Sequence, residues 1–540
     1  MLRKPFNTFA LGVLLASSAL VGCTMAPNYE RPNFAAAPEW QTPEGYDLPV
    51  GEAVATKLTW REFFADPHLQ RVIETALENN KDLRQSALNI AEARAMYRIS
   101  RADLLPTINA NGTYTGTESS ESSNFFGAGT WRTDLYEVNL GVAAYELDFF
   151  GRLRSQSNAA INDYLATKEA YAVVRNALIA ETANAYLQYL ADKKLLDLTQ
   201  KTLEAQKNTY DIVAQSLEKG LGTNQDLSRA ATAVETAQVN YHQYSRFVAQ
   251  DENALFLLMG VANDKTILGD ITLDDVQLHQ ELMAGLPSEV LLMRPDIRQA
   301  EFELKARNAE IGAARAAFFP SISLTGNYGF ASNTLDGLFS ESAFGAWMFM
   351  PQVRLPIFEG GRNRANLEVA NLRKRKEILQ YEDAIQTAFR EVADELAARA
   401  TLDEQLAAQN RLVEAAQKVY DLAKARYKSG VDSFLSVLDA QRELYTFQQS
   451  EITTQREQLA NLVTLYKVLG GGTEPQVYKK LDADDVEEPL EEQKKYKKVK
   501  RKQAQKEAKL EAKRAKKQAA LLRETLEVQA LESRQEVVPE

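Results

Sequence analysis

The 540-residue chain has few residues of the kinds that carry out chemistry: one cysteine and three histidines. A single cysteine cannot form a disulfide within the chain. His68, His242 and His279 are far apart, and none lies at a metal-ligand spacing or beside a serine and an acid. No GxxxxGK[ST] run is present to bind a nucleotide phosphate. We therefore predict no enzymatic activity, no metal and no cofactor.

Basic surface and long apolar runs are also scarce. The net charge is −11 and the pI is near 5.2, which argues against nucleic-acid binding because that requires a basic surface. After residue 23, no run reaches eighteen apolar residues, so no transmembrane helix is predicted. Hydrophobic residues make up 45% and charged residues 25%, which is typical of a chain with a sizeable core.

The N-terminal segment accounts for the single cysteine. Arg3 and Lys4 precede a short apolar run, which ends in the sequence LVGC at Cys23. This ending resembles a bacterial lipobox and implies a lipoprotein signal peptide over 1–22 with lipid on Cys23. Thr24 in place of aspartate implies sorting to the outer membrane. An ordinary signal peptide that happens to contain a cysteine is the alternative.

The rest of the chain is built from two copies of one plan. Pro106 and Pro320 open similar segments 214 residues apart, and Gly220 and Gly430 lie in similar segments 210 residues apart. Each half has a helix ending at a proline, two strand-like runs, a glycine, a very long helix, a glycine turn and a returning helix. The segments 152–219 and 362–429 contain no proline or internal glycine. At about 1.5 Å per residue, each predicts a helix near 100 Å long.

The strand-like runs alternate with a period of two. In 321–330, Ile322, Leu324, Tyr328 and Phe330 lie on one face and polar residues on the other. Apolar-out, polar-in strands of about ten residues are typical of outer-membrane β-barrels. Four strands cannot close such a barrel, and open sheet edges are not tolerated in lipid, so several chains must contribute. Three copies would supply twelve strands, and we predict a homotrimer.

These motifs together resemble the TolC-type outer-membrane efflux family, in its lipoprotein branch that serves resistance–nodulation–division (RND) pumps. The resemblance covers about residues 1 to 475. The motifs that carry it are Cys23, PNYERP (27–32), LLMRPDIRQAE (291–301), FEGGRNRAN (358–366) and GVDSFLSVLDAQRELY (430–445). It implies a mixed α+β membrane protein, a homotrimeric channel. A 12-stranded transmembrane β-barrel, four strands per chain, would continue into a long α-helical barrel in the periplasm.

The resemblance also implies functional positions at the helix tips. Leu435, Asp439 and Arg442 match the family's periplasmic gate, with three leucines as a constriction and Asp439–Arg442 contacts holding the helices inward. From the residues alone, an ordinary helix pair on a solvated face would be the simpler interpretation. We predict that a periplasmic adaptor docks at the two tip turns. The residues predicted to form these docking tips are Lys219, Gly220, Lys428 and Gly430.

The predicted organisation has five parts. The signal peptide covers 1–22 and a lipidated linker 23–60. The first efflux repeat covers 61–270, with strands at about 106–148, and the second covers 271–475, with strands at about 320–358. Residues 476–540 form a charged periplasmic tail, acidic and then strongly basic, predicted to be disordered or a solvated helix.

The resulting prediction is the outer-membrane channel of a tripartite efflux system. It would passively conduct toxic small molecules from an inner-membrane RND transporter and a periplasmic adaptor to the outside, with outer-membrane lipid around it and lipid on Cys23 as its anchor. The alternatives are the exit channel of a type I protein-secretion system, or a structural tether of the envelope. The sequence identifies neither the substrates nor the partner proteins.

Overall fold

A computed structural model describes most of the chain up to the end of its last long helix. Every described residue belongs to one compact unit that ends at Thr473. The predicted lipid site at Cys23 and the predicted tail at 476–540 lie outside the described residues, which are 24–32, 53–55, 58–119, 131–220, 222–279, 282–283, 292–340 and 344–472.

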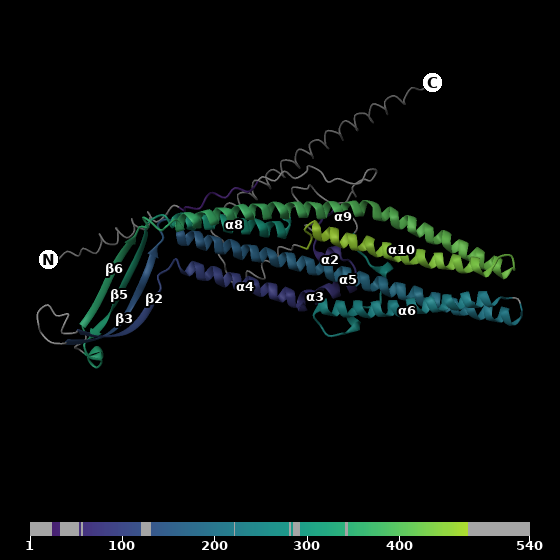
Figure 1. The fold of residues 1–540 in the computed structure, drawn as a ribbon, viewed down its shortest axis with the longest axis horizontal. Coiled ribbons are helices and arrows are strands. Elements are labelled where there is room, and N and C mark those ends of the chain that lie inside the picture. Colours follow the sequence, from purple (N-terminus) through teal and green to yellow (C-terminus); the bar gives the residue numbers. More distant parts are fainter. Residues whose placement is uncertain are drawn as a thin grey trace, which may run out of the picture. The chain divides into compact units, whose positions relative to one another are not determined.

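Four helices pack side by side in the order α4, α5, α8, α9 (Figure 1). Their bounds are Lys81–Ala102, Arg152–Glu218, Pro295–Ala316 and Arg362–Lys428. The helices α5 and α9 each have 67 residues, or about 100 Å at 1.5 Å per residue. This confirms the two predicted long helices. None of the described helices is both long and apolar enough to cross a membrane.

Each long helix turns back on itself to form a hairpin. The helix α5 is followed by α6 (Asn224–Met259), and α9 by α10 (Phe434–Val468). In the first turn, the Thr223 side chain caps α6 by accepting a hydrogen bond from the Asp226 N–H. Both hairpin turns lie at the same end of this unit, away from the sheet (Figure 1).

The four strands form one antiparallel sheet in the order β2, β3, β5, β6. Their bounds are Ile108–Ser119, Trp131–Leu147, Ser321–Ser332 and Phe344–Arg354. The β3–β5 pair joins the two halves of the chain. The predicted apolar face is exposed in a single chain, since Leu140, Tyr328 and Trp347 are 62%, 64% and 75% exposed. The register shifts at one bulge, where Ala144 has a φ of +52°.

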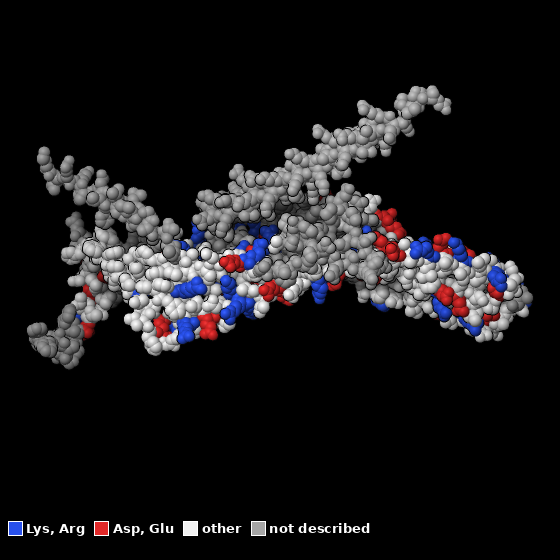
Figure 2. Space-filling view, turned by 90° about the horizontal axis from the view of Figure 1, so that it is seen from above, with Lys and Arg blue, Asp and Glu red and all other residues white. Residues whose placement is uncertain are grey.

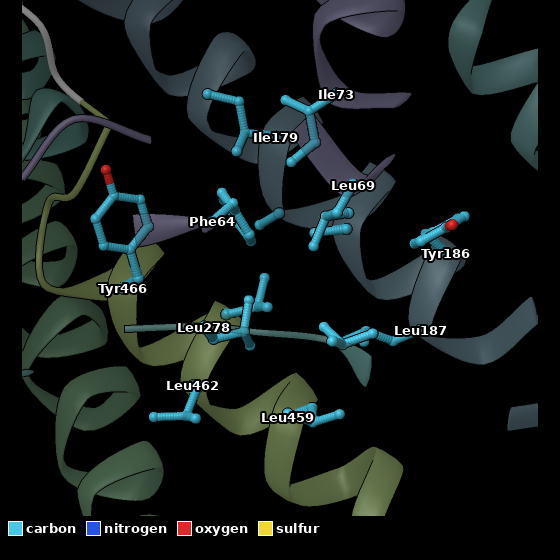
Figure 3. Packing of buried hydrophobic residues seen from close by; sticks show 14 of the residues in the cluster. Phe64, Leu69, Ile73, Ile179, Tyr186, Leu187, Leu278, Leu459, Leu462 and Tyr466 are labelled. Atoms are coloured by element: carbon cyan, nitrogen blue, oxygen red, sulfur yellow. The ribbon is translucent and has the colours of Figure 1, made fainter. Parts of the chain in front are cut away.

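The largest apolar core lies where both hairpins meet the short elements of the chain (Figure 3). Phe63 stacks on Tyr466 with ring centroids 4.1 Å apart, and the Tyr466 hydroxyl donates to the Leu58 carbonyl. The short elements around this core are β1 (Ala53–Val54), α2 (Trp60–Phe63), α3 (Pro67–Asn79), η3 (Lys265–Ile267), η4 (Leu273–Asp275) and β4 (Leu282–Met283). A further 3-10 turn, η5 (Gly337–Phe339), packs against the sheet.

The LLMRPDIRQAE motif has a structural explanation. Arg294 occupies the residue position just before α8, without a capping side-chain hydrogen bond, and is 7% exposed. Its guanidinium donates to both oxygens of Asp296 at 3.1 and 2.7 Å, to Glu391 at 2.6 Å and to the Val468 carbonyl at 2.9 Å. The side chain therefore joins the start of α8, the middle of α9 and the end of α10.

Candidate functional site: the helix tips and the N-terminal strap

The two hairpin turns have the same backbone geometry. Gly220 and Gly430 both have a φ of +73°, a conformation that glycine adopts without steric cost. In each turn, the glycine N–H donates a 2.9 Å hydrogen bond to a carbonyl three residues earlier, on Leu217 or Tyr427. Lys219 and Lys428 beside them are exposed. The four predicted docking residues therefore lie on two matching turns at one end of the unit.

An apolar cluster joins the two hairpins close to these turns. Tyr427 packs on Phe434 with ring centroids 5.5 Å apart. Burial, together with the negative charge of Asp226, raises the pKa of Tyr427. The buried members of the cluster are Val213, Ala230, Ala423, Phe434, Val437 and Ala440. Because these residues come from α5, α6, α9 and α10, the two tips of one chain are packed together.

The three predicted gate residues lie on the first turns of α10. Leu435 is 40% exposed. The Arg442 guanidinium lies 3.3 Å from the Asp439 carboxylate, and their side chains are 76% and 49% exposed. Within one chain the pair is therefore an i,i+3 contact on one helix. This agrees with the alternative interpretation of an ordinary helix pair on a solvated face. All three side chains are at least 40% exposed in the single chain, so they are accessible to a neighbouring molecule.

A second ion pair, which was not predicted from the sequence, lies at this tip. Arg426, in the last turn of α9, donates to both oxygens of Asp432, at 2.6 and 3.1 Å. Hydrogen bonding to Arg426 lowers the pKa of Asp432. The pair spans the Gly430 turn and has no counterpart in the first hairpin, where Ser216 and Gly222 occupy the matching positions. The sequence feature that could have predicted this ion pair is an arginine and an aspartate on opposite sides of a glycine turn.

Residues 24–32, which we call the strap, lie along one face of α8. The Asn308 side chain donates to the Pro27 carbonyl at 2.8 Å, and Arg31 pairs with Glu301 at 2.7 Å. A Cβ at Gly312 would lie 2.7 Å from the Ala26 nitrogen, so this glycine allows the close approach of the strap. The strap therefore runs antiparallel to α8, with Thr24 at the end of α8 that leads to the sheet.

Charge and ring contacts hold the other end of the strap. Lys305 lies over the Tyr29 ring at 5.4 Å from its centroid. Burial, and then the negative charge of Glu301, raises the pKa of Tyr29. Burial alone would raise the pKa of Glu301, but Lys305 and Arg31 outweigh it and lower that pKa. The PNYERP segment is thus a docking segment for α8.

Charged side chains of both signs are mixed on the face shown in Figure 2. Over the described residues, no group of three or more side chains is arranged to hold a metal ion. The charged residues visible on this face therefore form no large patch of a single sign.

Comparison with known proteins gives the family. The profile of the outer membrane efflux protein family matches residues 72–261 and 286–471. The chain is 46% identical over 464 residues to the probable efflux pump outer membrane protein TtgC of Pseudomonas putida, covering 86% of this chain and 95% of that protein.

Solved structures agree in fold. A membrane protein from Pseudomonas aeruginosa has a TM-score of 0.78 and 41% identity, covering 83% of this chain and all of that one. The open state of the MtrE outer membrane channel of Neisseria gonorrhoeae has a TM-score of 0.77 and 40% identity, covering 84% and 99%. The chain therefore belongs to the outer membrane efflux protein family and has the fold of a TolC-like outer-membrane channel, the outer-membrane component of an efflux system.

Proposed function

We propose that three copies of this chain form the passive exit channel of a tripartite efflux system, joined through a periplasmic adaptor to an inner-membrane RND transporter. One observation carries the proposal: within the described residues, both edges of the sheet and of the helix layer are unpartnered and carry exposed apolar side chains. The proposed channel catalyses no reaction, and the energy for transport comes from the transporter. Substrate choice lies with that transporter rather than with the channel.

The unpartnered edges occur at the same two sides of the sheet and of the helix layer. Within the described chain, β2 and β6 each pair with one strand only. The helices α4 and α9, which lead into β2 and out of β6, are likewise the outer members of their layer. Both carry apolar side chains that are 44% to 69% exposed: Leu88, Met96 and Ile99 on α4, and Val369, Leu372 and Leu379 on α9.

The two edges suit contact with each other. The three residues on α4 and the three on α9 have nearly the same spacing along helices of opposite direction. A contact between the α4–β2 edge of one copy and the α9–β6 edge of the next is head-to-tail, and such contacts form a ring when the rotation between copies closes. Closure satisfies the edge hydrogen bonds that lipid cannot. Three copies give twelve strands, an even number that suits a membrane barrel.

The strap supports a lipid anchor on Cys23. Its contacts with Gly312 and Asn308 place Thr24 at the sheet end of α8. A lipid there would add to the anchorage supplied by the strands. We expect mass spectrometry of the mature chain to find acyl groups on Cys23 and no residue before it.

The tips suit a gate and a docking surface. In a trimer, Leu435, Asp439 and Arg442 each occur three times around one axis, and their exposed side chains can meet across it. Exposed ion pairs contribute about 0–1 kcal/mol each, which suits a constriction that a docked adaptor opens. The two glycine turns, packed together through the apolar cluster, offer that adaptor one joint surface per chain.

Cysteine cross-linking tests the ring directly. A chain with Met96→Cys and Leu372→Cys should form disulfide-linked species up to a trimer on oxidation, and the ladder should end there. Either cysteine alone should stop at a linked pair or a monomer, and a Leu88→Cys/Met96→Cys chain, with both cysteines on one edge, should form no trimer. Monomer only, from a verified oligomer of the double variant, would contradict this edge pairing.

Single-channel conductance tests the gate. Wild-type current in planar bilayers should be low and should rise in Asp439→Ala/Arg442→Ala. The matched control is Glu414→Ala/Lys418→Ala, which removes an exposed 2.7 Å pair on α9 and should leave the current unchanged. A steady current in all three would place the gate elsewhere. No current from any verified trimer would favour the envelope tether, and passage of an unfolded protein substrate would favour protein secretion.

A further inference from the structure

The hairpin of α5 and α6 contains a buried layer that the channel function does not explain. Its two helices run antiparallel and side by side (Figure 1), and residues seven apart line their contact, as in a coiled coil. Counting equal numbers of residues away from the turn along α5 and α6 places Val213 opposite Ala230. Further layers follow at seven-residue steps: Gln206 with Ala237, Thr199 with Tyr244, and Asp192 with Asp251.

The last of these layers places two acids against each other. Asp192 is 6% exposed, and one of its oxygens accepts a 2.8 Å hydrogen bond from the Gln188 side chain. The Asp251 carboxyl lies within hydrogen-bonding reach of Asp192. Asp251 Oδ2 is buried and receives no hydrogen bond from any described residue. Two carboxylates in this position repel each other unless they share a proton.

The charged groups nearby are already engaged. Lys193 pairs with Asp270 at 2.9 Å and Lys194 with Asp274 at 2.7 Å. On α6, Glu252 pairs with Lys265 at 2.6 Å. In the part of the chain that the structure describes, no lysine, arginine or histidine forms an ion pair with either Asp192 or Asp251.

The other titratable groups near the pair are two tyrosines and one glutamate. Tyr244 of α6, whose hydroxyl accepts from Gln449 of α10, has its pKa raised by burial first and by Asp192 among other groups. Tyr445 of α10 shares a 2.8 Å hydrogen bond with Thr199. Glu451 of α10 faces Lys194 and Asp274 rather than the acid pair. No neighbour therefore supplies the positive charge that would stabilise two ionised acids.

The second hairpin shows that the fold does not require this pair. The chain repeats with an offset of 210 residues at the tips, which places Leu402 and Asn461 at the positions of Asp192 and Asp251. Both are buried, and Asn461 donates to Glu395 at 2.6 Å. The same architecture is thus built with a neutral layer in one half and an acid pair in the other.

We propose that Asp192 and Asp251 form a proton-dependent latch that fastens α6 to α5. With one proton between them, the hydrogen-bonded pair closes the layer. When that proton leaves, two like charges face each other in a partly buried site and the layer loosens. Since α5 continues from Asp192 to the Gly220 turn without a break, loosening here reduces the restraint on the whole first tip.

The proton leaves near neutral pH. Burial, and then the hydrogen bond and the charge of Asp192, raise the pKa of Asp251 to about 7, from 3.8 for an unperturbed aspartate. The folded hairpin therefore holds more protons than the unfolded chain between these two values, and its stability falls as the pH rises through that window. Between those two values, each pH unit favours the open, deprotonated layer by about tenfold, and above the folded pKa the effect levels off.

Hydrogen exchange of the purified full-length protein tests the latch without relying on the channel function. Wild type and Asp251→Asn are compared at the same pH, so that the intrinsic exchange rate cancels. From pH 6 to pH 8, the ratio of the wild-type to the Asp251→Asn exchange rate should rise about tenfold at the amides around Asp192 and Asp251. Asparagine keeps the size and supplies a permanent donor to Asp192, so this variant should fold.

Two further variants make the test specific. Asp211→Asn removes an exposed acid from the same helix and should behave as wild type. Leu402→Asp/Asn461→Asp places an acid pair in the second hairpin and should transfer the pH-dependent exchange to α9 and α10. A ratio of the two exchange rates that is the same at pH 6 and pH 8 would overturn the proposal. So would an infrared spectrum at pH 6 in which Asp251→Asn loses no protonated-carboxyl band.

Discussion

Replacing Arg294 by methionine should destabilise the junction of α8, α9 and α10. Methionine keeps much of the side-chain volume but removes every hydrogen bond of the guanidinium. Asp296, Glu391 and the Val468 carbonyl would then lose their shared donor. The arginine side chain is 9% exposed, so water cannot replace it without opening the junction.

The magnitude follows from how far each partner is buried. Breaking a fully buried ion pair costs about 3–5 kcal/mol. Here the carboxylates of Asp296 and Glu391 are 35% and 37% exposed, so water recovers part of their solvation. We therefore expect a loss of about 2–3 kcal/mol for Arg294→Met, or roughly 30- to 150-fold in the unfolding equilibrium. Arg294→Lys keeps the charge without the planar fork and should lose less.

Urea unfolding at fixed protein and detergent concentration measures this loss. The control is Arg373→Met, which removes a 64% exposed arginine that lies 4.0 Å from Glu310 and should cost less than about 0.5 kcal/mol. Adding Glu391→Gln to Arg294→Met should recover part of the loss, because it removes a carboxylate left without its partner. The reasoning fails if Arg294→Met is no less stable than Arg373→Met.

Three more changes test other parts of the structure. Gly430→Ala should cost about 1 kcal/mol, measured by urea unfolding, because the φ of +73° strains any L side chain; an unchanged midpoint would contradict a fixed turn. Glu301→Gln removes the Arg31 ion pair and should speed proteolysis of the strap. Because the folded pKa of Glu301 is lowered, wild type should lose the same protection as the pH falls below about 4.5; equal cleavage at pH 7 and pH 3.5 would count against it. Gly329→Val should prevent normal assembly of the sheet, since a Cβ there would collide with the Val138 carbonyl, and a normal yield of heat-resistant oligomer on gels would refute this.

Local sequence pattern was sufficient for the parts of the fold that depend on near neighbours. The alternation of Ile322, Leu324, Tyr328 and Phe330 predicted a strand with one apolar face, and in β5 the Tyr328 and Phe330 end of that face is exposed. Uninterrupted runs without proline or glycine predicted α5 and α9. Gly220 and Gly430 predicted the turns, because a backbone that must adopt positive φ leaves its signal in the residue type itself.

The candidate site was predictable only in part. The family resemblance located Leu435, Asp439 and Arg442, and the structure places them on an exposed face at the tip. Neither the Arg426–Asp432 pair nor the apolar cluster that joins the two tips was predicted. The cluster depends on Val213 and Val437 meeting across more than 200 residues of chain, and no local period encodes which two helices will meet.

By itself, the sequence determined the duplication, the type of each long element and the turn positions, because these follow from side-chain periodicity and backbone preference over a few residues. Only the tertiary structure decided which faces meet. It placed the strap on α8 through Arg31 and Glu301, 270 residues apart, and Tyr466 against Leu58, 408 residues apart. It also set Asp192 against Asp251, a pair whose meaning depends on burial. Burial is a property of the packed layers around a residue, and so it is not written in the residue's own neighbourhood of the chain.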